Sequence, residues 1–237
     1  MTETQLIVIL YVLVAARLGS HVVPQLVQPE ARRRSVHEFI DSVVVAGVTA
    51  LMLINFVVRS FYIPSGSMEQ TLHVNDYILV NEFIYRFSHP MRGEVIVFTP
   101  PPQAGDDNKD YIKRVVGLEG DVLQVKDGWL FRNGQKLEEP YVNDDPNDLR
   151  EPGFGPIHSI VSDAPHSLEL PFQVPKGHLF VMGDNRNNSR DSRYWGPLPV
   201  QNVVGKAMVI FYPFTRIGIL QSNSGTPLPG VPPISKP

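Results

Sequence analysis

The feature that most constrains this chain is an uncharged apolar run, Val43 to Ile54, within the segment Ile40 to Val58. Glu38 precedes the segment and Arg59 follows it. Such a run is typical of a helix that crosses a bilayer, although at about 1.5 Å per residue it is short for a hydrocarbon core of roughly 30 Å. A buried core helix is the alternative. We expect a membrane helix at about residues 40–58.

An earlier apolar run, Leu6 to Ala16, is shorter and ends at Arg17. A short membrane helix over about residues 4–20 and a segment lying on the membrane surface both stay open. A secretory signal peptide is a third interpretation, but the residues before the run carry Glu3 and no Lys or Arg. Arg17 and the Arg32-Arg33-Arg34 cluster precede the second run, so the positive-inside rule places everything after that run outside the cytoplasm.

Beyond residue 60 the apolar pattern changes to that of β-strands. The predicted strands are residues 77–80, 94–98, 111–116, 122–125, 129–132 and 203–212. Asp127-Gly128 and Asn133-Gly134 are typical hairpin turns, and no long stretch after residue 90 has helical periodicity. About residues 60–215 should therefore be mainly β, with an irregular loop at Asn143 to His166.

Several kinds of site are excluded or disfavoured by composition and motif. With no cysteine, the chain has no disulfide, thiolate metal site or cysteine nucleophile. The net charge of −3 offers no basic excess for a phosphate backbone, so no nucleic-acid partner is expected. No His-Glu-x-x-His occurs, which disfavours a zinc protease. Asp106-Asp107 and Asn143-Asp144-Asp145 are interpreted as solvated loop charges rather than metal sites.

The segment directly after the apolar run, Pro64-Ser65-Gly66-Ser67, is a candidate for nucleophilic chemistry. Pro64 fixes its own φ, and Gly66 permits a sharp bend that can aim hydroxyls and backbone N–H groups at one point. Such donors can stabilise an oxyanion. An ordinary Ser-Gly turn is the alternative interpretation of this segment alone.

A serine nucleophile needs a base, and the chain offers histidines and Lys113. No histidine lies in a recognisable triad motif, but triads are spatial and the sequence does not exclude one. Lys113 lies in a predicted strand with apolar neighbours, where burial would lower its pKa to about 7–8. A solvated strand lysine is the alternative. The polar segment Gly183 to Gly196 could orient such a lysine, or be a surface loop.

Four segments together resemble the ordered motifs of bacterial type I signal peptidases, and the resemblance covers about residues 40–212. They follow a membrane segment in the family's order: Ile63-Pro64-Ser65-Gly66-Ser67-Met68, Arg92-Gly93-Glu94-Val95-Ile96-Val97-Phe98, Asp110 to Gly117, and Gly183 to Gly196. One departure is that Glu69-Gln70-Thr71-Leu72 lacks the proline usual in this family.

The resemblance implies a role for each matching residue. Ser67 would be the nucleophile and Lys113 the general base, and Ser65 would add a hydroxyl to the oxyanion site. Ser189 would hydrogen-bond Lys113 and orient it. Asp191 and Arg193 would brace the loop that holds Ser189. No metal and no organic cofactor is implied.

The function implied is a membrane-bound endopeptidase that removes signal peptides from exported preproteins after small residues, the A-x-A pattern. The catalytic domain would lie on the extracytoplasmic side of the bacterial inner membrane, in contact with lipid and near the secretion machinery. The peptide would bind as an added strand beside residues 61–63, facing residues 110–112. The apolar positions expected to form its pockets, with Phe61 and Ile63 exposed, are Phe61, Ile63, Pro64, Met68, Leu72 and Ile112.

The implied fold is mainly β, an antiparallel catalytic domain with a smaller inserted β subdomain, preceded by one or two membrane helices. The predicted parts are an anchor region at 1–59, a catalytic domain at 60–121 and 176–215, an insert at 122–175 and a loose tail at 216–237. Two rivals are a self-cleaving repressor-type protease, which would need a DNA-binding segment in place of the anchor, and an inactive relative that only binds exported peptides.

Overall fold

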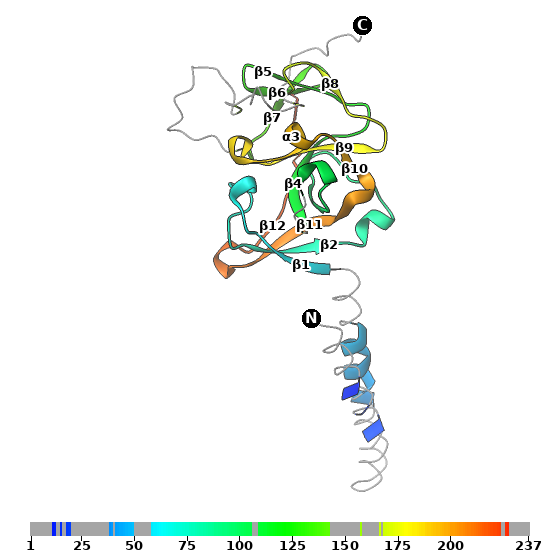
Figure 1. Ribbon diagram of the computed structural model, residues 1–237. Coiled ribbons are helices and arrows are strands. Elements are labelled where there is room, and N and C mark those ends of the chain that lie inside the picture. Colours follow the sequence, from blue (N-terminus) through cyan, green and yellow to red (C-terminus); the bar gives the residue numbers. More distant parts are fainter. Residues whose placement is uncertain are drawn as a thin grey trace. The chain divides into compact units, whose positions relative to one another are not determined.

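The computed structural model describes residues 11–12, 15, 18–19, 38–39, 41–49, 58–105, 109–142, 157, 166, 168–223 and 226–227 (Figure 1). The chain divides into two compact units, Met1–Val58 and Arg59–Pro237. The second is called the β unit below.

The first unit is helical at every described residue between 11 and 49. Residue 40 and residues 50–57 of the predicted membrane helix lie outside the described residues, as does most of the earlier run at 4–20. Over the part of the chain that the structure describes, none of the helices combines the length and the apolar character that crossing a bilayer requires. Val58, expected to end the helix, is instead the first residue of a strand.

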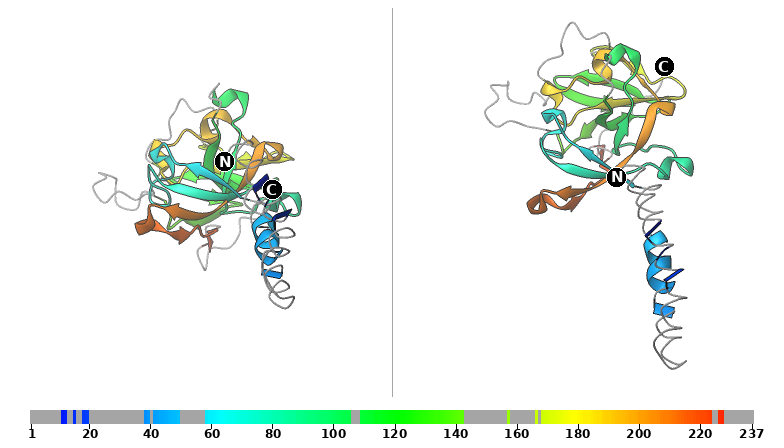
Figure 2. Two further views of the ribbon diagram at one scale, coloured as in Figure 1. Left: turned by 90° about the horizontal axis from the view of Figure 1, so that it is seen from below. Right: turned by 60° about the horizontal axis from the view of Figure 1, so that its bottom comes forward.

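The larger sheet of the β unit has eight strands within the described residues. The strands along its path are β1 (Val58–Tyr62), β2 (Tyr77–Asn81), β11 (Val203–Tyr212), β3 (Val95–Phe98), β4 (Tyr111–Gly117), β9 (His178–Met182) and β10 (Leu198–Pro199), and β12 (Gly218–Ile219) pairs with β11 off the path. The pairings of β11 with β2, β3 and β12, of β4 with β3 and β9, and of β9 with β10 are all antiparallel. The long strand β11, orange in the right-hand view of Figure 2, runs diagonally across the unit and pairs with both β2 and β3.

A second sheet has five strands within the described residues. In spatial order they are β13 (Thr226–Pro227), β7 (Gln135–Glu138), β6 (Trp129–Arg132), β5 (Val122–Lys126) and β8 (Phe172–Gln173). Its hairpins turn at the predicted dipeptides: Asp127 and Gly128 have φ of 49° and 72°, and Asn133 and Gly134 have 54° and 79°. Both residues of each pair are left-handed, which a two-residue turn between twisted strands requires.

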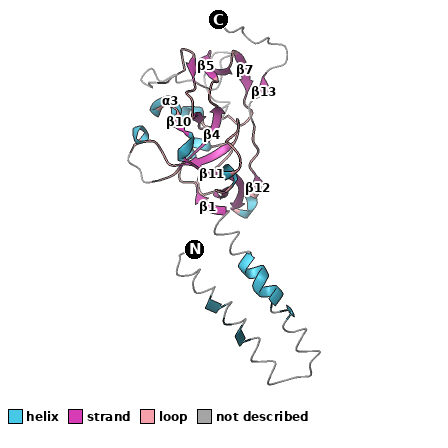
Figure 3. Cartoon of the chain, turned by 90° about the vertical axis from the view of Figure 1, so that its right-hand side faces the viewer, coloured by secondary structure: helices cyan, strands magenta, loops and turns pink. Residues whose placement is uncertain are grey.

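Helices in the described β unit are single turns, as Figure 3 shows in cyan. They are η1 (Gly66–Met68), η2 (Ile84–Arg86), η3 (Pro102–Ala104), η4 (Arg186–Asn188), α3 (Ser192–Trp195), η5 (Val200–Asn202) and η6 (Phe214–Arg216). The prediction of a mainly β fold without long helices after residue 90 is confirmed for the described β unit.

All six predicted strands are present, each within one or two residues of its expected bounds. The short strands β7, β8, β9, β10, β12 and β13 were not predicted. Two of these, β12 and β13, lie in the segment that we expected to be loose, where they pair with β11 and β7. Strands of two residues, which β8, β10, β12 and β13 are, carry too little alternation to be read from sequence. Strands β7 and β9 have four and five residues and were missed although strands of that length were predicted elsewhere. The predicted loop at Asn143 to His166 lies almost entirely outside the described residues.

Buried apolar side chains form three clusters in the β unit. The first joins the smaller sheet to β4 and β9 of the larger sheet and includes Leu123, Leu130 and Phe180. The second joins β1, β2 and β11 and includes Met68 and Ile78, whereas the third includes Phe98 and Trp195. Strand β4 therefore has core on both sides, and its polar side chains are buried with it.

Candidate active site

Ser67 lies in the single turn η1, directly after the first edge strand of the larger sheet. Ile63 N–H donates to the carbonyl of Asp76 at 2.9 Å, which ties the end of this strand to its neighbour. Asn185 holds the turn from the other side, because its backbone N–H donates to Ser67 O at 3.2 Å and its Nδ2 donates to Gly66 O at 3.1 Å. The turn leaves Ser67 only 9% exposed.

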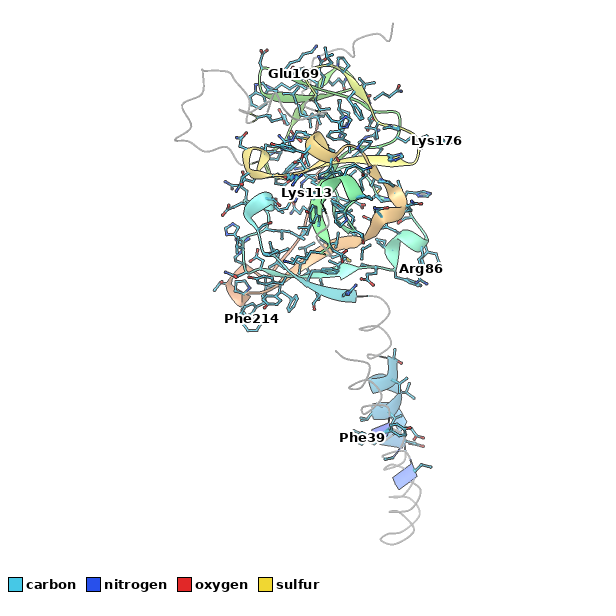
Figure 4. The ribbon with its side chains drawn as sticks, in the orientation of Figure 1. Phe39, Arg86, Lys113, Glu169, Lys176 and Phe214 are labelled. Atoms are coloured by element: carbon cyan, nitrogen blue, oxygen red, sulfur yellow. The ribbon has the colours of Figure 1, made fainter. Side chains whose placement is uncertain are left out.

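Lys113 reaches the same point from β4, and Figure 4 labels it in the interior of the β unit. Its Nζ lies 2.7 Å from Ser67 Oγ and donates to the carbonyl of Ile112 at 2.9 Å. The side chain is 5% exposed. Two residues 46 positions apart in the sequence thus form a buried hydroxyl–amine contact.

The surroundings of Lys113 change its acidity. Burial lowers the pKa of the Lys113 ammonium to about 8, while the carboxylates of Asp191 and Asp184 raise it in part and Arg193 lowers it. Because burial dominates, a substantial fraction of this amine is neutral near pH 8. A neutral amine 2.7 Å from a hydroxyl can accept its proton.

The polar loop between β9 and α3 packs against this contact through Gly183. A Cβ at Gly183 would clash with Ser189 Oγ and with the Ser67 carbonyl oxygen, so only glycine allows this approach. Asp191 accepts from Gly183 N–H at 3.0 Å and pairs with Arg193 through two bonds of 2.9 Å. Burial alone would raise the pKa of Asp191, but Arg193 and these hydrogen bonds hold it below its ordinary value.

The other two serines occupy different environments. Ser65 is exposed at the N-cap of η1, with extended backbone, one residue from the buried turn. Ser189 is buried, and among the described residues its Oγ has no partner within hydrogen-bond geometry, although its side chain helps to hold the pKa of Asp191 below its ordinary value. The hydrogen bond that we expected from Ser189 to Lys113 is therefore not formed, because Nζ contacts Ser67 Oγ and Ile112 O instead.

A buried ion pair beside the site was not predicted from the sequence. Arg114, the neighbour of Lys113 on β4, donates to both carboxylate oxygens of Asp184 at 2.8 and 2.7 Å. Thr71 Oγ1 donates to the same carboxylate at 2.5 Å, which links the segment after η1 to the polar loop. The sequence did contain a feature that could have predicted this ion pair, namely the adjacent charged residues Lys113 and Arg114 inside an apolar strand. Because neighbouring strand residues point to opposite faces, Arg114 needs a buried partner of its own on the face opposite Lys113.

The residues expected to form peptide pockets are mostly interior. Ile63, Met68 and Leu72 belong to the second core cluster and are 2%, 0% and 0% exposed, and Phe61 and Ile112 are half-buried against it. Pro64 alone in this set is exposed. The expectation that Ile63 is exposed is wrong, because its side chain faces the core from the end of the edge strand.

Two strand edges next to the site are open in the described part of the larger sheet. Strand β1 ends the sheet's path, with β2 on its other side. Strand β4 pairs with β3 from Tyr111, but its pairing with β9 begins only at Arg114. The edge at residues 111–113 is therefore available to another extended chain.

A buried serine against a lysine of lowered pKa is an arrangement that suits a hydrolase with a serine nucleophile. Residues 36–212 match the family described as signal peptidase, peptidase S26. The chain belongs to this family of serine endopeptidases.

Two named relatives match most of the chain. It is 40% identical over 197 residues to the probable signal peptidase I-1 of Synechocystis sp., covering 81% of this chain and 90% of the relative. It is 32% identical over 188 residues to the signal peptidase I S of Bacillus subtilis, covering 79% and 95%. A crystal structure of a signal peptidase I from Enterococcus faecalis is 29% identical, with a TM-score of 0.38 over 50% of this chain and 97% of that one.

Proposed function

We propose that this protein is a membrane-bound endopeptidase that removes signal peptides from exported preproteins, cleaving after A-x-A. The observation that carries the proposal is the buried 2.7 Å contact between Lys113 Nζ and Ser67 Oγ. Membership of the signal peptidase family supports the substrate class. The reaction is amide hydrolysis through an ester formed with Ser67, using a lysine as the base.

In the proposed mechanism, the neutral Lys113 amine takes the Ser67 proton as Oγ attacks the scissile carbonyl. Lys113 then returns this proton to the leaving amine, and the acyl group stays on Ser67. In the second half, Lys113 takes a proton from the water that attacks the ester, and it returns this proton to Ser67 Oγ as the ester bond breaks and the signal peptide leaves with a new carboxyl terminus. Ser189, which is buried and lies with the Ser67 carbonyl against Gly183, would hydrogen-bond the amine once Ser67 is acylated. Asp191 and Arg193 brace the loop that carries it.

The peptide is proposed to bind as a strand between residues 61–63 and residues 110–112. The A-x-A pattern has little side-chain surface, so main-chain hydrogen bonds to the open edges must supply much of the affinity. Alternation would point the two small side chains toward the protein and the middle one away. Phe61 and Ile112, which are half-buried, and the exposed Pro64 would line the pockets there, and the buried Ile63, Met68 and Leu72 would pack beneath them.

The membrane part of the proposal is based on the apolar segment Ile40 to Val58 and the basic residues before it. These features support a position in the bacterial inner membrane with the β unit on the extracytoplasmic side. Membrane lipid and nearby secretion machinery are the partners expected besides signal peptides. Residues 60–121 and 176–215 are proposed as the catalytic domain, and residues 122–175 as its insert.

The pH dependence of cleavage tests the role of Lys113. Only the neutral amine acts as a base, so kcat/KM should rise about tenfold per pH unit below the pKa and level off above about 8. The measurement is cleavage of a detergent-solubilised preprotein from pH 5 to 9, with single-turnover rates to show that chemistry is limiting. A flat profile under those conditions would contradict a titrating lysine.

Ser65→Ala is expected to lower kcat by about 10²–10³-fold, the usual effect of removing one oxyanion donor. The hydroxyl is exposed in the free protein and next to the turn that holds Ser67, so its loss should leave the fold unchanged. Steady-state kinetics of the purified variant measure the change. Ser65→Thr, which keeps a hydroxyl, is the matched control and should regain part of the rate. A rate equal to the parent's in Ser65→Ala would remove Ser65 from the site.

A further inference from the structure

The turn after β7, in the smaller sheet, reaches back to the loop that packs on Ser67. Both Nη atoms of Arg186 donate to Glu139, at 2.8 and 2.6 Å. The Arg186 side chain is 0% exposed and that of Glu139 is 6% exposed, so water does not screen this pair. Tyr141 Oη donates to the same carboxylate at 2.8 Å. Burial and then Glu139 raise the pKa of Tyr141 above its ordinary value, which keeps this hydroxyl a donor.

Arg186 also hydrogen-bonds the backbone of the polar loop, so it connects Glu139 to that loop. Its Nε donates to the carbonyl of Gly183 at 3.1 Å, and its own carbonyl accepts from Arg193 Nη2 at 2.6 Å. Gly183 is the residue whose missing side chain lets Ser189 and the Ser67 carbonyl lie close. Two successive hydrogen-bonded contacts, Glu139 to Arg186 and Arg186 to Gly183, therefore connect this carboxylate to the glycine that lies against the Ser67 carbonyl.

A second chain of contacts connects Glu139 to the loop through Tyr141. Its ring lies on the Arg114 guanidinium, with 3.9 Å from Cζ to the ring centroid. Arg114 in turn holds Asp184 through two hydrogen bonds. The chain of contacts through Arg186 and the chain through Tyr141 and Arg114 thus end on consecutive residues, Gly183 and Asp184. A loop of short polar side chains has few apolar contacts to hold it, so buried charged hydrogen bonds are what can fix its position.

We propose that Glu139 is a positioning residue for the reaction: it clamps the loop at 183–193 through Arg186 and so holds Ser67 and Lys113 in register. This inference rests on the proposed function for its kinetic consequence. The smaller sheet thereby contributes to catalysis, because the turn that follows its strand β7 contains Glu139 and Tyr141. The clamp does not touch the open strand edges, so peptide binding should not depend on it.

The test begins with Glu139→Gln in the full chain in detergent. We expect kcat to fall about 10- to 100-fold, the range for misplaced reacting groups, while KM changes less than about twofold. The matched control is Asp121→Asn. Asp121 is also buried and held by two hydrogen bonds from one arginine, Arg92, at 2.8 and 2.7 Å, but contacts no residue of the 183–193 loop among the bonds described. Its kcat should stay within about twofold of the parent's.

A double variant, Glu139→Gln with Arg186→Met, separates positioning from stability. It removes the buried charge that Glu139→Gln leaves unpaired, and such replacements usually restore stability. We expect the melting temperature to recover while kcat stays low. Recovery of the parent's kcat in the double variant would overturn the proposal, because only the stray charge would then have caused the loss. An unchanged kcat in Glu139→Gln would overturn it as well.

Amide hydrogen exchange gives a measurement that does not need activity. Exchange at residues 183–193 should be faster in Glu139→Gln and in the double variant than in the parent and in Asp121→Asn. Unchanged exchange in this loop would overturn the clamp whatever the kinetics show. If the parent itself does not cleave preproteins, the proposed function fails, and the exchange data still decide whether Glu139 holds the loop.

Discussion

Ser67→Ala is expected to lower kcat for signal-peptide cleavage by roughly 10⁴- to 10⁶-fold, the range seen when a serine hydrolase loses its nucleophile. Ser67 Oγ contacts the Lys113 amine at 2.7 Å, and the variant leaves that amine without an oxygen to activate. The residual rate would come from whatever binding and oxyanion contacts remain. Quantitative cleavage of a purified preprotein, followed on gels over long incubation, measures the loss.

Ser88→Ala is the matched control for this variant. Ser88 is exposed, and its Oγ donates only to the Ile84 carbonyl among the bonds described. Its activity should stay within about twofold of the parent's. A purified Ser67→Ala protein that cleaves at the parent's rate, with mass spectrometry confirming the substitution, would show that another group is the nucleophile.

Lys113→Met should cause a loss of similar size, about 10⁴-fold or more, because no other base contacts Ser67 Oγ among the described hydrogen bonds. Methionine keeps the length and apolar stem of the side chain, so core packing should be retained. Lys113→Arg should be equally inactive, since a guanidinium keeps its proton and cannot act as a base. The measurement is single-turnover cleavage at pH 9, where the parent's amine is mostly neutral.

Stability distinguishes a lost base from a lost fold. The folded-state pKa of Lys113, about 8, is below its ordinary value of 10.5. The unfolded state therefore binds the proton more tightly, and the folded state carries the full cost of burying the ammonium below pH 8. That cost disappears as the pH rises toward 10.5. Lys113→Met removes it, so the melting temperature at pH 7 should be at least the parent's.

An inactive Lys113→Met protein with a lowered melting temperature would instead indicate damage to the core. Lys126→Met is the control for the loss of a lysine as such. Lys126 is an exposed residue at the end of β5, in the smaller sheet. Its substitution should leave cleavage unchanged within about twofold.

Local pattern was enough to predict the longer strands and the hairpin turns of the smaller sheet. Alternating or continuous apolar runs of four or more residues identified six strands, although they missed β7 and β9, and Asp-Gly and Asn-Gly adopt the left-handed conformations that tight hairpins need. The sequence also placed Ser67 and Lys113 among the candidates through ordered motifs. It gave no means of choosing between a solvated and a buried Lys113, because burial depends on what packs against β4.

Other features came only from the tertiary structure. The expected pocket residues Met68 and Leu72 prove to be core, since apolar character alone does not distinguish a pocket wall from an interior. The pair Glu139 and Arg186 is 47 residues apart, and no local periodicity connects its members. The need for glycine at position 183 arises from the close approach of Ser189 and Ser67, which belong to different segments.

The sequence by itself determined the family, the mainly β character of residues 60–215 and the order of the candidate catalytic residues. Each of these can be recognised from short contiguous stretches of sequence. Only the tertiary structure decided which of those residues meet, how deeply Lys113 is buried and which charges surround it. The physical reason is that pKa, burial and hydrogen-bond geometry depend on distances across the sheets. Those distances are set when β4, the turn at Ser67 and the loop at 183–193 pack together.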